Sequence, residues 1–291
     1  MAVAEPFTVQ LPKLRGRNRP QFEMLRRVGW LDRVALAAFG GVTLIAIFAK
    51  AIAPYSPSAT PGEPFISPGH GGFYLGTDDV GRDIYSRVLF GIQSTWFSAL
   101  IVIASGVLIG GLIGLVAGAS GGWLDSALMR ITDVFLALPG PVLAITIVAA
   151  LGPSLWHTLI AVMIVWWPLY ARIVRGEIRA LASRPHMEAA RLAGAKRLRL
   201  MFRHLMPGAI PSTIVAASLD VSALIITLSS LSFLGLGAPA PAPELGAMSA
   251  RGINYLIQYS YIPVIPALAV FFVAVVANLA GDGARDLMGD R

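Results

Sequence analysis

Six long apolar segments are the feature that most limits what this chain can fold into. They cover residues 34–53, 96–119, 131–151, 155–174, 208–237 and 260–280. About 20 apolar residues in a helix cross the hydrocarbon core of a bilayer, and a helix satisfies its own backbone hydrogen bonds in lipid. We therefore predict an all-α polytopic membrane protein with six transmembrane helices.

The composition agrees with a membrane location. Hydrophobic residues make up 56% of the 291 residues and charged residues only 13%, whereas soluble domains carry about 25% charged residues. The net charge of +7 would suggest a nucleic-acid partner in a soluble protein. Here it is explained by basic loops on one side of a membrane, so no nucleic-acid partner is expected. The chain has no cysteine, which excludes a disulfide framework and a thiolate metal site.

The basic residues also predict an orientation. Residues 1–33, 120–130 and 172–207 and the tail after the last span together hold 19 Lys and Arg, against 3 in the segments of the other side. The positive-inside rule then places both termini and the basic loop in the cytoplasm of a multi-pass membrane protein. Residues 1–33 are predicted to form a basic cytoplasmic tail, with an interfacial helix over 20–32. No cleaved signal peptide is expected, because no short apolar core with a small-residue cleavage site is present.

Glycine and proline predict details inside the spans. Glycines recur every four residues in the second span, which provides a face for close helix contact. They are Gly106, Gly110, Gly114 and Gly118. Pro139 and Pro141 are predicted to kink the third span. The fifth span, 208–237, is long for a simple crossing.

The basic segment 184–207 lies between the fourth and fifth spans. Gly194 interrupts a helical pattern and permits a turn, while Pro185 and Pro207 bracket the segment because each disfavours helix at the residue before it. We predict helix, glycine break and helix outside the bilayer. The second helix is predicted to carry one apolar stripe of Leu198, Met201, Phe202 and Leu205. By itself this pattern also fits an ordinary basic helical loop.

The order of residues in this segment resembles the EAA loop of binding-protein-dependent ABC importer permeases. The matching residues are Glu188-Ala189-Ala190, then Gly194, then His204-Leu205-Met206-Pro207. The general family tail is Ile-x-Leu-Pro, and this chain departs from it with His204 and Met206. Phe202-Arg203-His204 before the proline resembles the peptide-importer branch.

Four further segments resemble the same branch, so that the likeness covers about residues 70 to 291. They are Leu75–Asp83, Gly121–Asp125, Met129-Arg130 with Asp133 and Pro139-Gly140, and Leu231–Gly237. The chain thus resembles the C-type permease subunit of oligopeptide and dipeptide ABC importers. The resemblance implies a type I ABC importer permease fold in the bacterial inner (plasma) membrane, with 54–95 as an extracytoplasmic segment and 96–291 as the permease core. It also implies a cytoplasmic coupling helix within 184–207.

The resemblance implies the partners as well. They are a homologous permease subunit in a heterodimer, two ATP-binding subunits or one fused ATPase, an extracytoplasmic peptide-binding protein, and membrane lipid. The family's ATPase-coupling residues map here to Glu188, Ala189, Ala190, Gly194, Ala195, Phe202, His204 and Pro207. ATP and Mg would be bound by the ATPase subunits, so no cofactor is expected in this chain.

The residues themselves predict no catalytic site. The sequence has no Gly-x-x-x-x-Gly-Lys-Ser/Thr loop and no Gly-x-Ser-x-Gly elbow. The four histidines are widely spaced and no His-Glu-x-x-His occurs, so no metal site is expected.

The residues from Gly76 to Asp83 form the most distinctive cluster of glycine and charged residues in the predicted extracytoplasmic segment. One interpretation is a patch, containing Asp78, Asp79, Arg82 and Asp83, that docks the binding protein or faces the pore mouth. The favoured interpretation is a structural turn, because Asp and Gly cap helices and turns, and Asp83 is predicted to begin the helix that leads into the second span.

Asp220 is an acid near the middle of the fifth span. Thr213 and Thr227 lie two turns away on the same side. A charged side chain at this depth faces protein or water, so we predict that Asp220 lines the pore or the seam with the partner permease. The alternative is an Asp that packs against a hydroxyl on a neighbouring helix.

Three hypotheses for the function follow. The first is import of peptides, with oligopeptides as the expected substrate. The second is the same architecture importing dipeptides, nickel chelates, glutathione or another peptide-like ligand. The third is a proton-driven secondary carrier, which inverted repeats and buried acid pairs would favour; the sequence has no convincing repeat.

Overall fold

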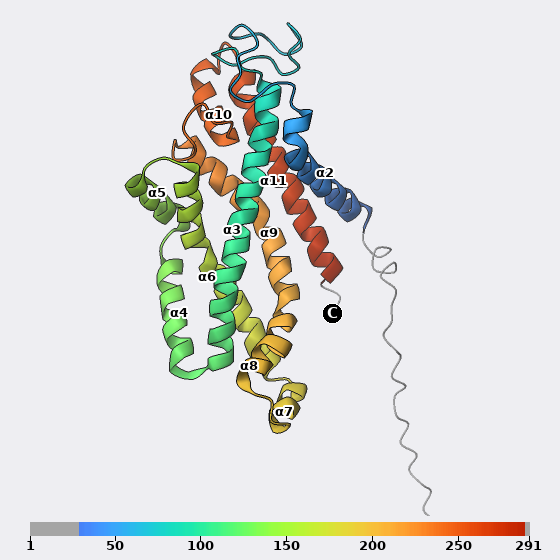
Figure 1. Cartoon of the computed structure of the whole chain (residues 1–291), viewed down its shortest axis with the longest axis vertical. Helices are drawn as coiled ribbons and strands as arrows, with labels where there is room; N and C mark the ends of the chain where they lie inside the picture. Colours follow the sequence, from blue (N-terminus) through green and yellow to red (C-terminus); the bar gives the residue numbers. More distant parts are fainter. Residues whose placement is uncertain (1–28, 289–291) are drawn as a thin grey trace, which may run out of the picture.

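A computed structural model describes residues 29–288, and these residues form a bundle of helices (Figure 1). The elements are α2 (Trp30–Ile52), α3 (Ile84–Ser120), α4 (Gly122–Ala137), α5 (Gly140–Leu151), α6 (Leu155–Ala182), α7 (Pro185–Leu192), α8 (Arg197–Leu200), the π turn η1 (Met201–Leu205), α9 (Met206–Phe233), α10 (Leu245–Gly252), the 3-10 turn η2 (Ile253–Tyr255) and α11 (Tyr261–Met288). The predicted basic tail over 1–33 and the interfacial helix over 20–32 lie almost entirely outside the described residues.

The described residues contain five helices long and apolar enough to cross a membrane, or six if one bent pair counts as a span. The five are α2, α3, α6, the run from Leu198 through α9, and α11, and each overlaps one of the six predicted spans. The bent pair is α4 and α5, which meet at 84°. Pro139 and Pro141 lie at the bend, where a proline removes a backbone donor and clashes with the preceding turn. The predicted kink is therefore present, and it is a sharp break.

The glycine ladder of α3 forms its contact with α6. A Cβ added at Gly118 would lie 2.8 Å from the Cβ of Ile178, and one added at Gly106 would lie 3.0 Å from the ring of Tyr170. At Gly110 and Gly114 the added atom would collide with the α6 backbone itself. Since lipid removes most of the hydrophobic drive between helices, close backbone packing of this kind holds α3 and α6 together.

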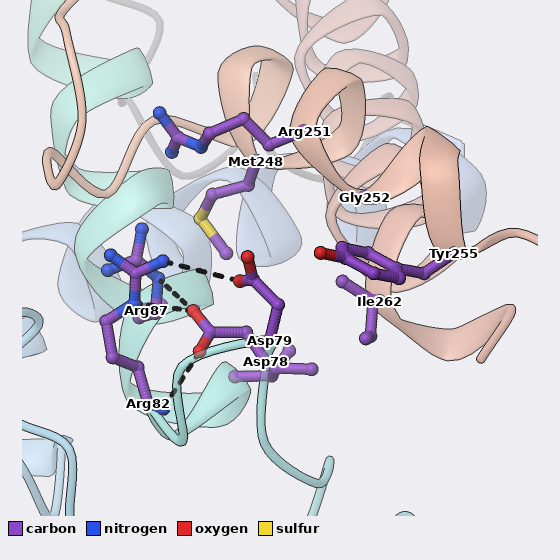
Figure 2. Close-up of a pocket in the computed structure, with 10 residues that line it drawn as sticks. Asp78, Asp79, Arg82, Arg87, Met248, Arg251, Gly252, Tyr255 and Ile262 are labelled. Atoms are coloured by element: carbon purple, nitrogen blue, oxygen red, sulfur yellow. Dashed lines mark hydrogen bonds and ion pairs between the residues drawn. The ribbon is translucent and has the colours of Figure 1, made fainter. Parts of the chain in front are cut away.

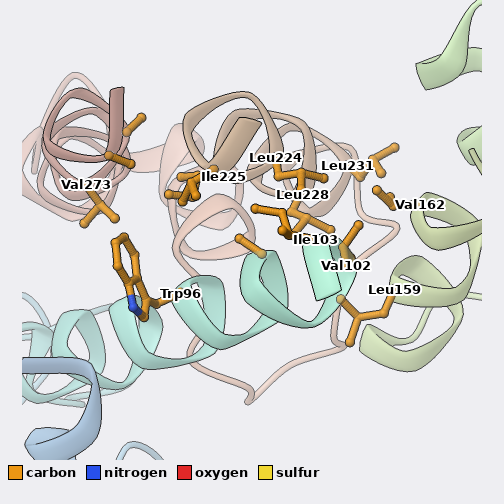
Figure 3. Packing of buried hydrophobic residues seen from close by; sticks show 14 of the residues in the cluster. Trp96, Val102, Ile103, Leu159, Val162, Leu224, Ile225, Leu228, Leu231 and Val273 are labelled. Atoms are coloured by element: carbon orange, nitrogen blue, oxygen red, sulfur yellow. The ribbon is translucent and has the colours of Figure 1, made fainter. Parts of the chain in front are cut away.

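The core of the bundle lies around the middle of α3 (Figure 3). Trp96 and Val102 of α3 pack in one cluster with Leu224 and Ile225 of α9 and Val273 of α11. All five side chains are buried. The same cluster also contains Val42 of α2 and Leu159 of α6, so it joins the five long helices of the described residues.

The molecule has two different ends along its long axis. The segment between α2 and α3 and the helix α10 lie at one end, and α7 and α8 lie at the other (Figure 1). The helix α3 begins at Ile84, twelve residues before the predicted span, so its first three turns lie at the same end as α10. Following the predicted orientation, we call this end the outer end, and the end with α7 and α8 the inner end. A separate hydrophobic cluster packs Ile84 and Val88 against Leu245 and Met248 of α10.

Candidate functional site

The turn at Gly194 joins α7 to α8. Gly194 has φ +79°, a conformation that L side chains rarely adopt, and a Cβ there would meet no atom within 4 Å. The Ala195 amide donates to the Ala190 carbonyl at 3.1 Å, which closes the end of α7 as in a Schellman motif. The predicted helix, glycine break and helix are confirmed, and the turn opens onto free space.

One side of residues 184–207, which we call the coupling segment after their predicted role, is anchored in the bundle. Met187 of α7 is only 1% exposed, and Met201 and Leu205 of η1 are also buried. They pack in one cluster with Leu115 of α3 and Ile178 of α6. A single packed cluster thus includes residues of α7, η1, α3 and α6, and closely packed interiors of this kind transmit strain.

The other side of the coupling segment is exposed and partly apolar. Leu192, Leu198 and Phe202 are 86%, 67% and 52% exposed. The prediction of one apolar stripe is wrong, because Met201 and Leu205 face the bundle while Leu198 and Phe202, one helical turn apart, face away. Large apolar side chains exposed together mark a surface that binds a partner or lipid.

The predicted coupling residues are placed on both sides. Six are exposed, namely Glu188, Ala189, Gly194, Phe202, His204 and Pro207. Ala190 and Ala195 are half-buried and pack against the cluster around Met187. Glu188 lies in the first turn of α7, where a carboxylate interacts favourably with the helix dipole.

Pro207 was predicted to end the helix of the coupling segment, and this prediction is wrong. The chain passes from η1 directly into α9, and Pro207 lies in the first turn of α9. The Met206 amide donates to the carbonyl of Met201, five residues earlier. Proline is tolerated in a first helical turn, where its missing N–H is not needed, and the wider π turn precedes it. The segment after Gly194 is therefore continuous with the fifth span.

Asp220 contacts α6 inside the bundle. The Trp166 Nε1 donates to the Asp220 Oδ2 at 3.1 Å, and Asp220 is half-buried. The hydroxyls of Thr213 and Thr227 donate to the carbonyls of Ala209 and Ala223 on their own helix, each at 2.8 Å. The hydroxyls of the two threonines are thus bonded within α9. The alternative prediction was that Asp220 packs against a hydroxyl on a neighbouring helix, and its partner there is instead the indole of Trp166.

The outer cluster forms a tight turn. The Asp78 Oδ1 accepts from the Arg82 amide at 2.9 Å, and its Oδ2 accepts from the Arg82 Nε at 2.6 Å. Asp83 caps α3 by accepting from the Ser86 amide at 2.8 Å, as predicted. Asp79 is more exposed and lies 3.7 Å from Arg82. Asp78 and Asp83 therefore have the structural role, while Asp79 faces a small pocket (Figure 2).

Comparison with known proteins identifies the family. The model of the binding-protein-dependent transport system inner membrane component family matches residues 110–291. The chain belongs to this family.

The resemblance to C-type peptide-importer permeases is confirmed by relatives of this permease. It is 39% identical to the probable D,D-dipeptide transport system permease protein DdpC of Escherichia coli (strain K12), over 84% of this chain and 82% of that protein. It is 35% identical to the dipeptide transport system permease protein DppC of Haemophilus influenzae (85% and 86%). It is 39% identical to the glutathione transport system permease protein GsiD of Escherichia coli O6:K15:H31 (92% and 90%).

A solved structure matches the permease fold. The inward-facing MetNI methionine ABC transporter aligns with a TM-score of 0.57, over 70% of this chain and 97% of the matched chain. The identity is 19%, so this similarity concerns the fold alone. The all-α polytopic fold of a type I importer permease is confirmed.

Two buried carboxylates of this permease were not predicted as site residues. Asp125 of α4 is 2% exposed and pairs with Arg175 through two hydrogen bonds of 2.5 and 2.9 Å, and also with Arg179. The four-residue spacing of the two arginines on one helix was the available signal. One turn earlier on α6, Arg172 pairs with the exposed Asp133 at 2.7 Å.

Glu244 is the second such carboxylate. It accepts from the Ser232 hydroxyl and, at 2.7 Å, from the Ala238 amide. Burial raises the pKa of Glu244 above its usual range, although both hydrogen bonds act in the opposite direction. Glu244 thereby fixes the loop between α9 and α10, and no motif in the sequence pointed to it.

Proposed function

We propose that this permease is one half of the pore of an ATP-driven peptide importer. It pairs with a homologous permease in a heterodimer, and two ATP-binding subunits, or one fused ATPase, contact the coupling segment. The observation that supports this proposal is the two-sided coupling segment. Its buried side belongs to the bundle, whereas its exposed side presents Leu192, Leu198 and Phe202 beside an open glycine turn.

The geometry supports a rigid transfer of motion. Met187 is buried against helices of the bundle, so α7 moves with the helices that it touches. Gly194 closes α7 without a side chain, which leaves room for a partner's backbone. Closure of the ATPase pair on ATP would draw the coupling segments together and reorient the two helix bundles between inward and outward states. ATP and Mg are bound by the ATPase subunits in this scheme.

Peptides are the proposed substrate because the relatives' names concern dipeptides, D,D-dipeptides and glutathione. Oligopeptides are the main expectation. Dipeptides, glutathione and nickel chelates are the alternatives within the same architecture. Selection would lie largely in the extracytoplasmic binding protein, which delivers one ligand class to the pore. A secondary carrier is the competing class of function.

The test is uptake into proteoliposomes that contain the complete complex. We expect accumulation of a labelled oligopeptide only with the binding protein outside and ATP with Mg at the ATPase side. A dipeptide, glutathione and a nickel chelate, each with the same binding protein, rank the alternatives. Uptake that needs a proton gradient and continues without ATP would contradict the proposal and favour a carrier.

We also propose that both termini and the coupling segment are cytoplasmic. The 3 Lys and Arg on one side against 19 on the other support this orientation. Because the chain has no cysteine, His70→Cys and Lys196→Cys each introduce a single label. In sealed right-side-out vesicles an impermeant maleimide is expected to label position 70 only. Labelling of position 196 would contradict the orientation.

A further inference from the structure

A pocket at the outer end gathers the three arginines of the outer segments (Figure 2). Arg82 and Arg87 come from the start of α3 and the turn before it, and Arg251 comes from the last turn of α10. Asp78 and Asp79 are the acids that line the same pocket. Residues far apart in the sequence thus line one pocket with three arginines and two aspartates.

Two of these arginines are already engaged. Arg82 holds Asp78 at 2.6 Å. Arg87 is 2% exposed, lies 3.7 Å from Asp78, and donates to the Pro57 carbonyl at 2.6 Å. These contacts make Arg82 and Arg87 a fixed frame around Asp78.

Arg251 has no carboxylate within ion-pair distance among residues 29–288. Within the described residues it donates one hydrogen bond, to the Ala242 carbonyl at 3.2 Å, although a guanidinium has five N–H donors. Burial and the neighbouring Arg82 lower the pKa of Arg251 from its usual range, while the charges of Glu244, Asp78 and Asp79 act in the opposite direction. A half-buried cation of this kind gains most from a ligand that brings a negative charge.

We propose that the outer arginine pocket, formed by Arg82, Arg87 and Arg251 with Asp78 and Asp79, binds a carboxylate through Arg251. The proposed carboxylate is an acidic side chain of the extracytoplasmic binding protein, so this inference rests on the binding protein of the proposed function. Arginine and carboxylate pair through two parallel hydrogen bonds. Asp79 lines the same pocket, and its negative charge would repel the incoming carboxylate.

The position of the pocket favours a docked protein over a peptide in transit. Arg87 lies nine residues before the predicted second span begins at Trp96, which is about 13 Å along a helix. The other walls come from α10 and the first turn of α11. The pocket therefore lies beyond the outer edge of the spans, on the surface that meets the binding protein.

The test compares variants of opposite sign in the purified complex, with its peptide-loaded binding protein as the probe. ATPase activity is titrated against the binding protein to obtain its half-saturating concentration. Arg251→Gln retains a donor for Ala242 and is expected to raise this concentration about tenfold. Asp79→Asn is expected to lower it about threefold, because it removes a competing charge. Arg251→Lys should fall between wild type and Arg251→Gln.

Lys50→Gln is the matched control, since it removes an exposed charge at the end of α2 that does not line the pocket. It should leave the half-saturating concentration unchanged. If wild type is stimulated while Arg251→Gln and Asp79→Asn both stay within twofold of it, the pocket has no docking role. If the effect of Arg251→Gln disappears with a C-terminally amidated peptide, the carboxylate belongs to the substrate and the docking proposal is wrong. Absence of stimulation in wild type would instead refute the proposed function.

Discussion

The outer and inner ends of this permease are built in different ways. At the outer end the loop before α3 is held by hydrogen bonds across it, such as Phe65 N to Asp78 O at 3.2 Å and Ile66 N to the Thr77 hydroxyl at 2.8 Å. At the inner end Leu192 and Leu198 are mostly exposed, and Gly194 borders free space. The loop at the outer end is held by its own hydrogen bonds, whereas the coupling segment at the inner end has an exposed apolar surface.

The largest effect is expected from Gly194→Trp in the inner end. The indole would occupy the space beside the turn and impose a side chain on a left-handed residue, so contact with the ATPase subunits should be lost. Gly69 is a matched control at the outer end, because it has the same φ of +79° and also has no atom within 4 Å of an added Cβ. Copurification of the ATPase subunits should fall at least about tenfold for Gly194→Trp and stay near wild type for Gly69→Trp. Equal copurification in both variants would mean that the turn at Gly194 is no more important for binding the ATPase subunits than the loop at Gly69.

The second prediction concerns the ion pairs that connect α4 to α6. Asp125→Asn leaves Arg175 and Arg179 without their carboxylate, which should lower the free energy of unfolding by about 2 kcal/mol, less than for a fully buried pair because Arg179 is half-exposed. Asp133→Asn, in the exposed pair of the same two helices, should change it by less than about 1 kcal/mol. Thermal unfolding of the purified complex measures both. Similar losses in the two variants would show that burial does not distinguish the pairs.

The sequence predicted the elements better than the contacts between distant elements. Five spans, the glycine ladder and the turn at Gly194 follow from local patterns, because apolar length and glycine spacing act within one helix. The pairing of Asp125 with Arg175 depends on how α4 lies beside α6. That placement involves the 84° break between α4 and α5, which local patterns do not specify. Pro207 was wrongly predicted to end a helix because the π turn before it is a backbone adjustment that no residue pattern predicts.

The third prediction concerns Asp220, which lies between the two ends. Asp220→Asn can still accept from the Trp166 Nε1, so the helices should assemble normally. If Asp220 acts through its charge in the pore or the seam, Asn should reduce peptide uptake several-fold, and Asp220→Leu should do the same. Uptake in proteoliposomes and the yield of assembled complex separate the outcomes. Wild-type uptake in Asp220→Asn, with failed assembly in Asp220→Leu, would assign the residue to packing alone.

The smallest effect is expected from Glu244→Gln at the outer end, and it takes the form of a pH dependence. Burial raises the pKa of Glu244, so the folded state favours the protonated acid more than the unfolded state does. Its contribution to stability is then fully present below the unfolded pKa and is lost as the pH rises through the raised pKa. Glutamine can accept from the Ala238 amide and donate to the Ser232 hydroxyl, so both contacts of the loop have a replacement. In acid the variant should be nearly as stable as wild type. At higher pH it should not lose the stability that wild type loses when Glu244 ionises. Thermal unfolding of both proteins across a pH series tests the sign, and a steeper decline in the glutamine variant would mean that the ionised carboxylate stabilises the loop.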